Sequence, residues 1–255
     1  VIEEGVPEIG AFAFRACSAL ATIKIPSSVL NIGQYAFASC PKLGSGVVIV
    51  DDCVLTINGA CPSHLTIPEG TRLITGHVFY DHAEELKSVS IPSSMVTIGD
   101  WAFFGCTNLT SVVMNGCINI GKQAFRDCLR LRNLTIPEGI KSIHENAFLG
   151  CENLSCVYFN GDAPEIVGDG IYSGTSDSLI TFVKRRSVGW KKHGALGLPP
   201  FWPGIGNDSR LIEYQDLGDV LIHVVEFSLG DHGSVVDGEV YQIVEDCCAA
   251  SAPDV

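Results

Sequence analysis

Cysteine is the residue type in this chain that could carry the most chemistry, since eleven of the 255 residues are cysteines. Cysteines can be bridged as disulfides, can bind zinc and can react as thiolates. No Cys-x-x-Cys spacing occurs in the sequence, and the seven histidines follow no spacing that suits a metal. We therefore expect no structural zinc, no other metal and no cofactor. Five of the cysteines recur at a regular interval: Cys17, Cys40, Cys106, Cys128 and Cys151.

The regular interval favours a structural role for these five thiols. Equivalent positions in stacked repeats would lie about 4.8 Å apart, which meets the lower range of disulfide Cα separations, but their side chains would point in parallel. We predict buried free thiols, with disulfides as the alternative. In an extracellular protein, free thiols would indicate a reducing or anaerobic setting. Cys53 and Cys61 flank an expected hairpin without facing each other, and Cys247-Cys248 is interpreted as two unrelated small residues.

The sequence contains none of the common catalytic motifs. It has no Gly-x-Ser-x-Gly, no phosphate-binding loop, no His-Glu-x-x-His and no dinucleotide-binding fingerprint. Asp51-Asp52 is a carboxylate pair, but an acidic hairpin turn accounts for it without catalysis. We expect that the chain is not an enzyme.

The segments that carry the cysteines are copies of one repeat. The motif Ile-Gly-x-x-Ala-Phe-x-x-Cys begins at Ile9, Ile32, Ile98 and Ile120, and at Ile143 with histidine in place of glycine. A weaker copy begins at Ile74. The steps between successive isoleucines are 23, 42, 24, 22 and 23 residues. A period in the low twenties is typical of a solenoid, in which each repeat buries its apolar face against its neighbours.

The two halves of the repeat predict different local structures. The second half reads Leu-x-x-Ile-x-Ile-Pro, as in residues 20–26, and apolar residues two apart predict one half-buried strand per repeat that ends at the proline. The Ala-Phe-x-x-Cys half has apolar residues at helical offsets and predicts one short helical turn. We expect its phenylalanines to form a continuous buried ladder: Phe14, Phe37, Phe103, Phe125 and Phe148.

Over residues 1–160 the joint occurrence of these two patterns resembles the BspA-like leucine-rich repeats of bacterial surface proteins. The resemblance implies a leucine-rich repeat solenoid of mostly short parallel β-strands with short helical turns, shaped as a right-handed horseshoe or rod. It also implies contacts with other molecules and a location at the cell surface or outside the cell.

Three segments depart from the repeat. An insert over 44–63 contains Asn58-Gly59, a strong hairpin-turn signal, and we expect a β-hairpin arm that projects from the stack, as a binding element or as padding of a tolerant loop. Residues 161–215 are interpreted as a degenerate repeat and a C-terminal cap. Residues 216–255 are interpreted as a linker and an incomplete β-rich module, similar to the start of Listeria-Bacteroides repeat modules.

The composition limits the partners. The formal net charge of −13 opposes binding to nucleic acid or to an anionic membrane. No run of about 18 apolar residues occurs, so we expect no membrane insertion. Residues 2–9 align with residues 67–74, so the chain begins inside a repeat, and a signal peptide would lie outside it.

These observations predict a non-enzymatic interaction or adhesion region of a secreted or cell-surface bacterial protein. The expected partner is a protein or a host extracellular-matrix ligand, with a glycan as a further candidate. The alternative is a recognition or spacer region of a larger extracellular enzyme. Carbohydrate binding could also use Trp190 and Trp202 of the expected cap as a platform, although a lid over the solenoid end explains both residues.

The candidate binding residues are those between the apolar positions of each strand, because side chains alternate along a strand. The first column is Thr22, His64, Ser88, Ser111, Asn133 and Cys156. The second is Lys24, Thr66, Ser90, Val113, Thr135 and Tyr158. Most are small and uncharged, which suits a broad partner. The alternative explanation for the serines and threonines is β-propensity and cross-strand pairing alone.

Overall fold

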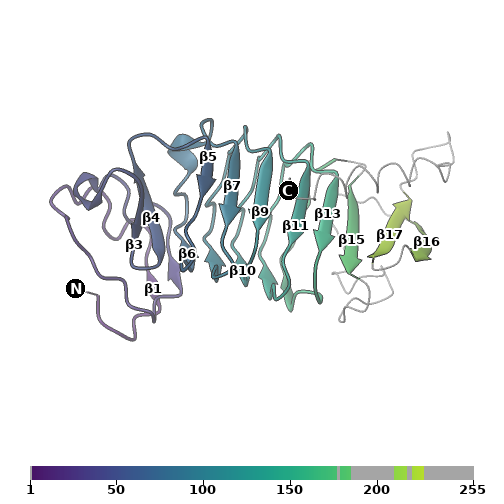
Figure 1. The fold of residues 1–255 in the computed structure, drawn as a ribbon, viewed down its shortest axis with the longest axis horizontal. Coiled ribbons are helices and arrows are strands. Elements are labelled where there is room, and N and C mark those ends of the chain that lie inside the picture. Colours follow the sequence, from purple (N-terminus) through teal and green to yellow (C-terminus); the bar gives the residue numbers. More distant parts are fainter. Residues whose placement is uncertain (1, 177–178, 185–209, 217–219, 227–255) are drawn as a thin grey trace.

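The computed structural model describes residues 2–176, 179–184, 210–216 and 220–226. Up to residue 176 the chain winds into a stack of coils whose strands lie side by side along the long axis of the molecule (Figure 1). Among the described residues the only helices are two short 3-10 turns, η1 (Pro41–Leu43) and η2 (Tyr80–His82). The leucine-rich repeat solenoid is therefore confirmed. We number coils 1 to 6 by the first residue of the repeat motif: Ile9, Ile32, Ile74, Ile98, Ile120 and Ile143.

Regular coils contribute strands to two ladders. The longer strands come from the Ile-x-Ile half of the repeat: β5 (His64–Thr66), β7 (Ser88–Ile91), β9 (Ser111–Met114), β11 (Asn133–Ile136), β13 (Cys156–Phe159) and β15 (Ile180–Lys184). The short strands are β1 (Glu8–Ile9), β2 (Asn31–Ile32), β6 (Leu73–Ile74), β8 (Thr97–Ile98), β10 (Asn119–Ile120), β12 (Ser142–Ile143) and β14 (Ile166–Val167). These strands pair in parallel within four sheets: β5-β7-β9 and β11-β13-β15 among the longer strands, and β1-β2 and β6-β8-β10-β12-β14 among the short ones. The pattern predicts one strand per repeat, and the second strand arises because the isoleucine of Ile-Gly also pairs between coils.

The glycine of Ile-Gly allows this close pairing. A Cβ atom on Gly99 would lie 2.6 Å from the carbonyl oxygen of Ile74 and 2.7 Å from the amide nitrogen of Gly76 in the preceding coil. A side chain at Gly99 would therefore push coils 3 and 4 apart.

The Ala-Phe-x-x-Cys segment is a run of tight turns, where the spacing predicts a helical turn. In coil 4 Trp101 and Gly105 have left-handed backbone, with φ of 55° and 71°, and such residues interrupt a helix. The N–H groups of Trp101, Phe103 and Gly105 donate to carbonyls of coil 5, whereas those of the residues between them donate within the turn. Hydrogen bonds between coils thus replace those of a helix.

The phenylalanine rings stack in two separate rows. The longer row is buried and continues into Tyr172, with ring centroids 4.6, 4.9, 5.6 and 5.5 Å apart: Phe79, Phe103, Phe125, Phe148 and Tyr172. The other row is Phe14 and Phe37, 5.1 Å apart, and Phe14 is only half-buried in the first coil. Within the described residues no ring contact joins Phe37 to Phe79. The prediction of one continuous buried ladder is wrong, because an insert separates coils 2 and 3.

The five recurring cysteines are free thiols, as predicted. Three of the recurring thiols donate to a phenylalanine carbonyl in a preceding coil, as Cys128 Sγ does to Phe103 at 3.3 Å and Cys151 Sγ to Phe125 at 3.1 Å. The recurring thiols are buried, except for half-buried Cys17 in the first coil. Cys247-Cys248 lies outside the described residues.

The insert over 44–63 folds as a hairpin of two antiparallel strands, β3 (Gly46–Val50) and β4 (Cys53–Asn58). Its two-residue turn is Asp51-Asp52, in which Asp51 is left-handed with φ of 53°. The turn is not Asn58-Gly59, as the sequence signal suggests. The side-chain amide of Asn58 instead donates to the carbonyl oxygens of Cys40 and Gly44, at 3.0 and 2.9 Å.

This hairpin is built into the stack and does not project from it. Strand β4 pairs in parallel with β6 of coil 3, and residues 53–56 are buried. Cys53 and Leu55 pack into the core of the first two coils, whereas Val54 packs into the core of the later coils. The prediction of a projecting arm is wrong, because β4 has apolar side chains on both faces and both faces are covered.

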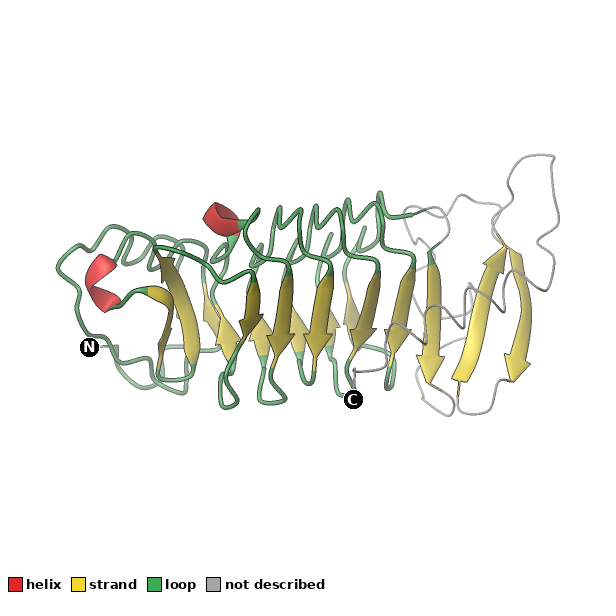
Figure 2. Ribbon diagram, turned by 45° about the horizontal axis from the view of Figure 1, so that its top comes forward, coloured by secondary structure: helices red, strands yellow, loops and turns green. Residues whose placement is uncertain are grey.

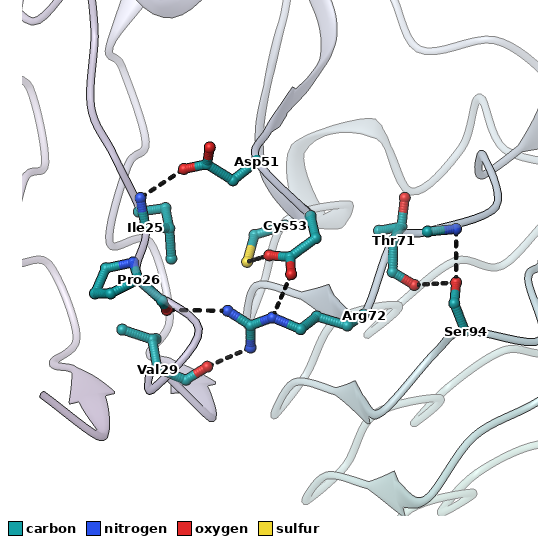
Figure 3. A network of polar contacts seen from close by, with 10 residues as sticks. Ile25, Pro26, Val29, Asp51, Cys53, Thr71, Arg72 and Ser94 are labelled. Carbon is teal, nitrogen blue, oxygen red and sulfur yellow. Dashed lines mark hydrogen bonds and ion pairs between the residues drawn. The ribbon is translucent and has the colours of Figure 1, made fainter. Parts of the chain in front are cut away.

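A polar network fixes the hairpin to the coils on either side (Figure 3). Arg72, next to β6, donates from Nε to Asp52 Oδ2 at 2.6 Å. Its two Nη atoms donate to the carbonyls of Pro26 and Val29, in the loop between coils 1 and 2. Asp51 accepts a backbone N–H of the same loop at 2.7 Å. The carboxylate pair therefore has a structural role as a hairpin turn, as expected.

Beyond β15 the long-strand ladder continues with two antiparallel strands, β17 (Val220–Glu226) and β16 (Arg210–Asp216), in the order β11-β13-β15-β17-β16 (Figure 2). A separate Listeria-Bacteroides module is not confirmed. Trp190 and Trp202 lie outside the described residues, and the domain boundaries near 160 and 215 stay predictions. Within the described part of the chain, no helix has the length and apolar character needed to cross a membrane.

Candidate functional site

The longer strands lie side by side along one side of the stack (Figures 1 and 2), and the predicted binding residues from His64 onward belong to these strands. Parallel pairing sets them in two columns. One column places His64, Ser88 and Ser111 side by side, and the other places Thr66, Ser90 and Val113 side by side. Farther along, Asn133 pairs with Cys156 and Thr135 with Tyr158. The register predicted from the repeat is therefore correct for these strands.

Alternation along each strand turns one set of side chains to solvent. In β9, Val113 is 50% exposed and Ser111 is also exposed, whereas Val112 and Met114 are each 7% exposed. The same alternation holds in β7 and β11. None of the residues in β5, β7, β9, β11 or β13 is an aspartate, glutamate, lysine or arginine. The face is therefore a broad surface of uncharged side chains.

Local contacts on this face join neighbouring strands. His64 Nδ1 lies 2.7 Å from Ser88 Oγ, a hydrogen bond between equivalent positions of β5 and β7. This contact supports the view that cross-strand pairing explains part of the serine and threonine content.

Three predicted positions do not belong to this exposed face. Thr22 and Lys24 are exposed, but the structure has no strand at residues 20–25, and β5 pairs with β7 alone. The hairpin β3–β4 enters the stack between those residues and β5, which ends both columns at His64 and Thr66. Cys156 pairs with Asn133 in the outward column but is only 5% exposed, so its thiol is not available at the surface.

A pocket that sequence reasoning missed lies where the hairpin separates coils 2 and 3. Its volume is about 460 Å³, within the range of small-molecule pockets. The walls come from the turns of both coils and from β4, and they include Tyr35, Thr56, Thr75, His77 and Asp81. Tyr35 and His77 stack on each other with ring centroids 4.8 Å apart.

The pocket borders a strip of aromatic side chains on the turn side of the solenoid. Four of them occupy one repeat position, two residues before the buried aromatic ring: Phe12, Tyr35, His77 and Trp101, with successive centroids 5.7, 4.8 and 5.3 Å apart. Tyr80 and Phe104 form a second row, 5.5 Å apart. The repeat alignment contains a signal for this strip, since it places these aromatic residues in two columns.

The described residues contain no group of three or more histidine, cysteine, aspartate or glutamate side chains that could hold a metal ion. His82 Nδ1 lies 3.0 Å from Glu85 Oε1.

The sequence also matches a known family. A family model of the BspA type leucine-rich repeat region, with six copies, covers residues 1–61 and 56–177. The chain belongs to the BspA-type leucine-rich repeat family. Comparison of this BspA-type chain with curated proteins gives no match.

Solved structures of other leucine-rich repeat proteins are similar to this BspA-type chain. A leucine-rich cell surface protein from Faecalibacterium prausnitzii is 26% identical, over 71% of this chain and 52% of that chain, with a TM-score of 0.47. The leucine-rich repeat protein of T. pallidum is 32% identical, over 68% of this chain and 72% of that chain, with a TM-score of 0.39. The chain thus spans about half the length of the F. prausnitzii protein.

Proposed function

We propose that this BspA-type chain is a non-enzymatic interaction region that binds a partner protein through the face of β5, β7, β9, β11 and β13. The observation that carries the proposal is the set of uncharged outward side chains on that face, which stand in register within β5-β7-β9 and within β11-β13. A partner can cover such a face without leaving a charge buried and unpaired, which would be costly.

The proposed contact residues are the outward side chains of these strands. They are His64, Thr66, Ser88, Ser90, Ser111, Val113, Asn133, Thr135 and Tyr158. Hydroxyl and amide groups give hydrogen bonds at the surface of a partner, and Tyr158 supplies an aromatic contact of the kind that is enriched at interfaces. Thr22 and Lys24 are not part of the proposed surface.

We infer further that the chain acts in a secreted or cell-surface bacterial protein, with a host or extracellular-matrix protein as partner. The family supports this inference, as does the F. prausnitzii relative, which is a cell surface protein. The alternative, a recognition or spacer region of a larger extracellular enzyme, differs in what adjoins the chain, and the full-length gene product separates the two.

The test is the double substitution Ser111→Arg and Thr135→Arg. Binding is measured against a panel of immobilised extracellular-matrix proteins, and stability by thermal unfolding. Two long cations on the uncharged face should abolish binding and leave the melting temperature nearly unchanged, because Ser111 is exposed and Thr135 is partly exposed.

The matched control is Ser18→Arg with Ser27→Arg, which adds the same charge at two exposed positions of coil 1. The control should bind as the unmodified chain does. Equal loss of binding in both double variants would show that added charge and not the face is responsible, and full binding by the first variant would overturn the proposal. Deleting the hairpin is not a usable test, because its buried residues belong to the core.

A further inference from the structure

The pocket between coils 2 and 3 exists because the repeat is locally irregular. The buried hairpin separates the two coils, and one outward turn position is small in coil 2, where Ala38 stands in the column of Arg15, Tyr80, Phe104 and Arg126. Coil 3 is irregular too. It forms the 3-10 turn η2 and places Asp81 in the pocket wall.

The lining of the pocket carries one carboxylate, that of Asp81, and the guanidinium of Arg15 lies outside the lining, 5.9 Å from the ring centroid of Tyr35. None of the described residues that line it is a lysine or an arginine, and Asp81 contributes a carboxylate. The pKa of His77 is lowered by burial, against the opposing effect of Asp81 and Asp100, so its imidazole is neutral at pH 7. The pKa of Tyr35 is raised, first by burial and then by Asp81, whose effect exceeds the opposing effect of Arg15. The pocket therefore favours a cation.

The aromatic strip already holds guanidinium groups at its two ends. The Arg15 guanidinium lies 5.5 Å from the ring centroid of Phe12, and that of Arg126 lies 5.4 Å from the centroid of Phe104. Between these ends stand Tyr80 and the pocket. Tyr80 is 43% exposed, and none of the cations among the described residues stacks on its ring.

Two polar atoms in the pocket walls have no hydrogen-bond partner among the described residues: Thr75 Oγ1 and His77 Nδ1. Thr75 is 1% exposed. Both atoms are enclosed by the protein, so they add to the energetic cost of the gap between the coils and are not contact points for a ligand.

We propose that this pocket binds an arginine side chain of a partner protein, with Asp81 pairing with the guanidinium and Tyr80 stacking beside it. This proposal rests on the interaction function proposed above and assigns a second contact point to it. Arginine fits better than a neutral ligand because it is a donor-only cation facing the carboxylate of Asp81 and the serine hydroxyls of the pocket lining. It fits better than lysine because its planar group stacks on aromatic rings, as Arg15 and Arg126 do here.

The test uses the full chain and two isosteric small probes in NMR titrations. Nα-acetyl-arginine-N-methylamide carries the guanidinium, and Nα-acetyl-citrulline-N-methylamide replaces it with a neutral urea group. The arginine probe should bind about tenfold more tightly than the citrulline probe, because a charge-assisted pair is lost in the latter. Its binding should shift the ring signals of Tyr35 and Tyr80.

Two variants locate the site. Asp81→Asn should weaken the arginine probe about tenfold, whereas Glu84→Gln should leave it unchanged, since Glu84 is exposed, close in sequence, and not part of the pocket. Ala38→Leu should block binding by filling the gap. It should fold, because Leu149 occupies the same column in coil 6.

Three outcomes would overturn the proposal. The first is equal affinity for both probes, the second is equal loss in Asp81→Asn and Glu84→Gln, and the third is binding of N-acetylglucosamine but not of the arginine probe. Since the assay needs no partner protein, its failure would leave the sheet-face proposal standing. Failure of the Ser111→Arg and Thr135→Arg test would likewise leave the pocket result standing.

Discussion

At the scale of single residues, coils 2, 4, 5 and 6 are each held by one buried phenylalanine ring and one buried thiol. Phe125 is fully buried and stacks on Phe103 and Phe148, in the two neighbouring coils. The thiol of Cys151 donates to the carbonyl of the same Phe125. Each of these side chains therefore contacts two coils at once, and its loss affects the contact between coils as well as its own burial.

Replacing Phe125 by alanine should lower the free energy of unfolding by about 3 to 5 kcal/mol, because it leaves a cavity between two stacked rings. Urea-induced unfolding measures the change. Phe12→Ala is the control, since Phe12 is 44% exposed and should cost much less. Similar losses of unfolding free energy in the two variants would show that the buried row of rings stabilises the protein no more than an exposed ring does.

The buried thiols should make the protein less stable at alkaline pH. Burial raises the pKa of Cys106 and of Cys117 to about 12, whereas an exposed thiol in the unfolded chain titrates near about 8.5. Because the folded pKa is the higher one, the stability contribution is complete below pH 8.5 or so and is lost as pH rises toward 12. The loss should be roughly 1 kcal/mol per thiol for each pH unit in that window.

Urea unfolding at pH 7, 9 and 10 measures how steeply the free energy of unfolding falls as pH rises. The double variant Cys106→Ala and Cys117→Ala should show a shallower decline, which separates the thiols from lysine and tyrosine titration. An identical slope in the variant and the unmodified chain would contradict the assignment.

At the scale of elements, the hairpin β3–β4 decides how the first two coils join the rest. Its strand β4 pairs with β6 and contributes to both hydrophobic cores. Arg72 links β4 to the loop between coils 1 and 2 through Asp52, Pro26 and Val29. One side chain thus ties together three segments that are distant in sequence.

Arg72→Met should lower the free energy of unfolding by about 1 to 3 kcal/mol, since it leaves a carboxylate and two carbonyl groups without their donor. Asp52→Asn in the same background should cost little more, because the two side chains share one interaction. Chemical denaturation of both single variants and the double variant measures the coupling. Strictly additive losses would show that the pair does not act as a unit.

At the scale of the whole molecule, the stack is open-ended, so its length grows with the number of coils while each coil contacts only its neighbours. The long-strand ladder presents one broad face, and the aromatic strip with its pocket lies on the turn side of the same coils. Two surfaces of different chemistry therefore run along one elongated body.

Small-angle scattering of the whole chain should show an elongated particle with a radius of gyration clearly above the value of about 18 Å expected for a compact domain of this length. A chain truncated after residue 215 should keep its fold if the predicted boundary is correct. A radius near 18 Å for the whole chain would contradict the solenoid.

The sequence by itself determined the solenoid, the register of the longer strands and the buried phenylalanine and cysteine positions. These features follow from residues that recur every 22 to 24 positions, and parallel stacking converts such a recurrence directly into neighbours in space. The same recurrence missed the second strand of each coil and the left-handed turns, because both depend on hydrogen bonds between coils and not on side-chain spacing.

Only the tertiary structure decided that the insert is buried within the stack and that a pocket forms beside it. Two turn signals compete in the insert, Asp51-Asp52 and Asn58-Gly59, and the pairing of β4 with β6 favours the first. With the turn at Asp51-Asp52 the hairpin is buried between coils 2 and 3. It therefore interrupts the row of phenylalanine rings, ends the two columns of strand residues at β5 and leaves the pocket beside Asp81. The deciding contacts of Arg72 reach 20, 43 and 46 residues along the chain, and they involve a hairpin turn and a loop whose positions the repeat pattern does not specify.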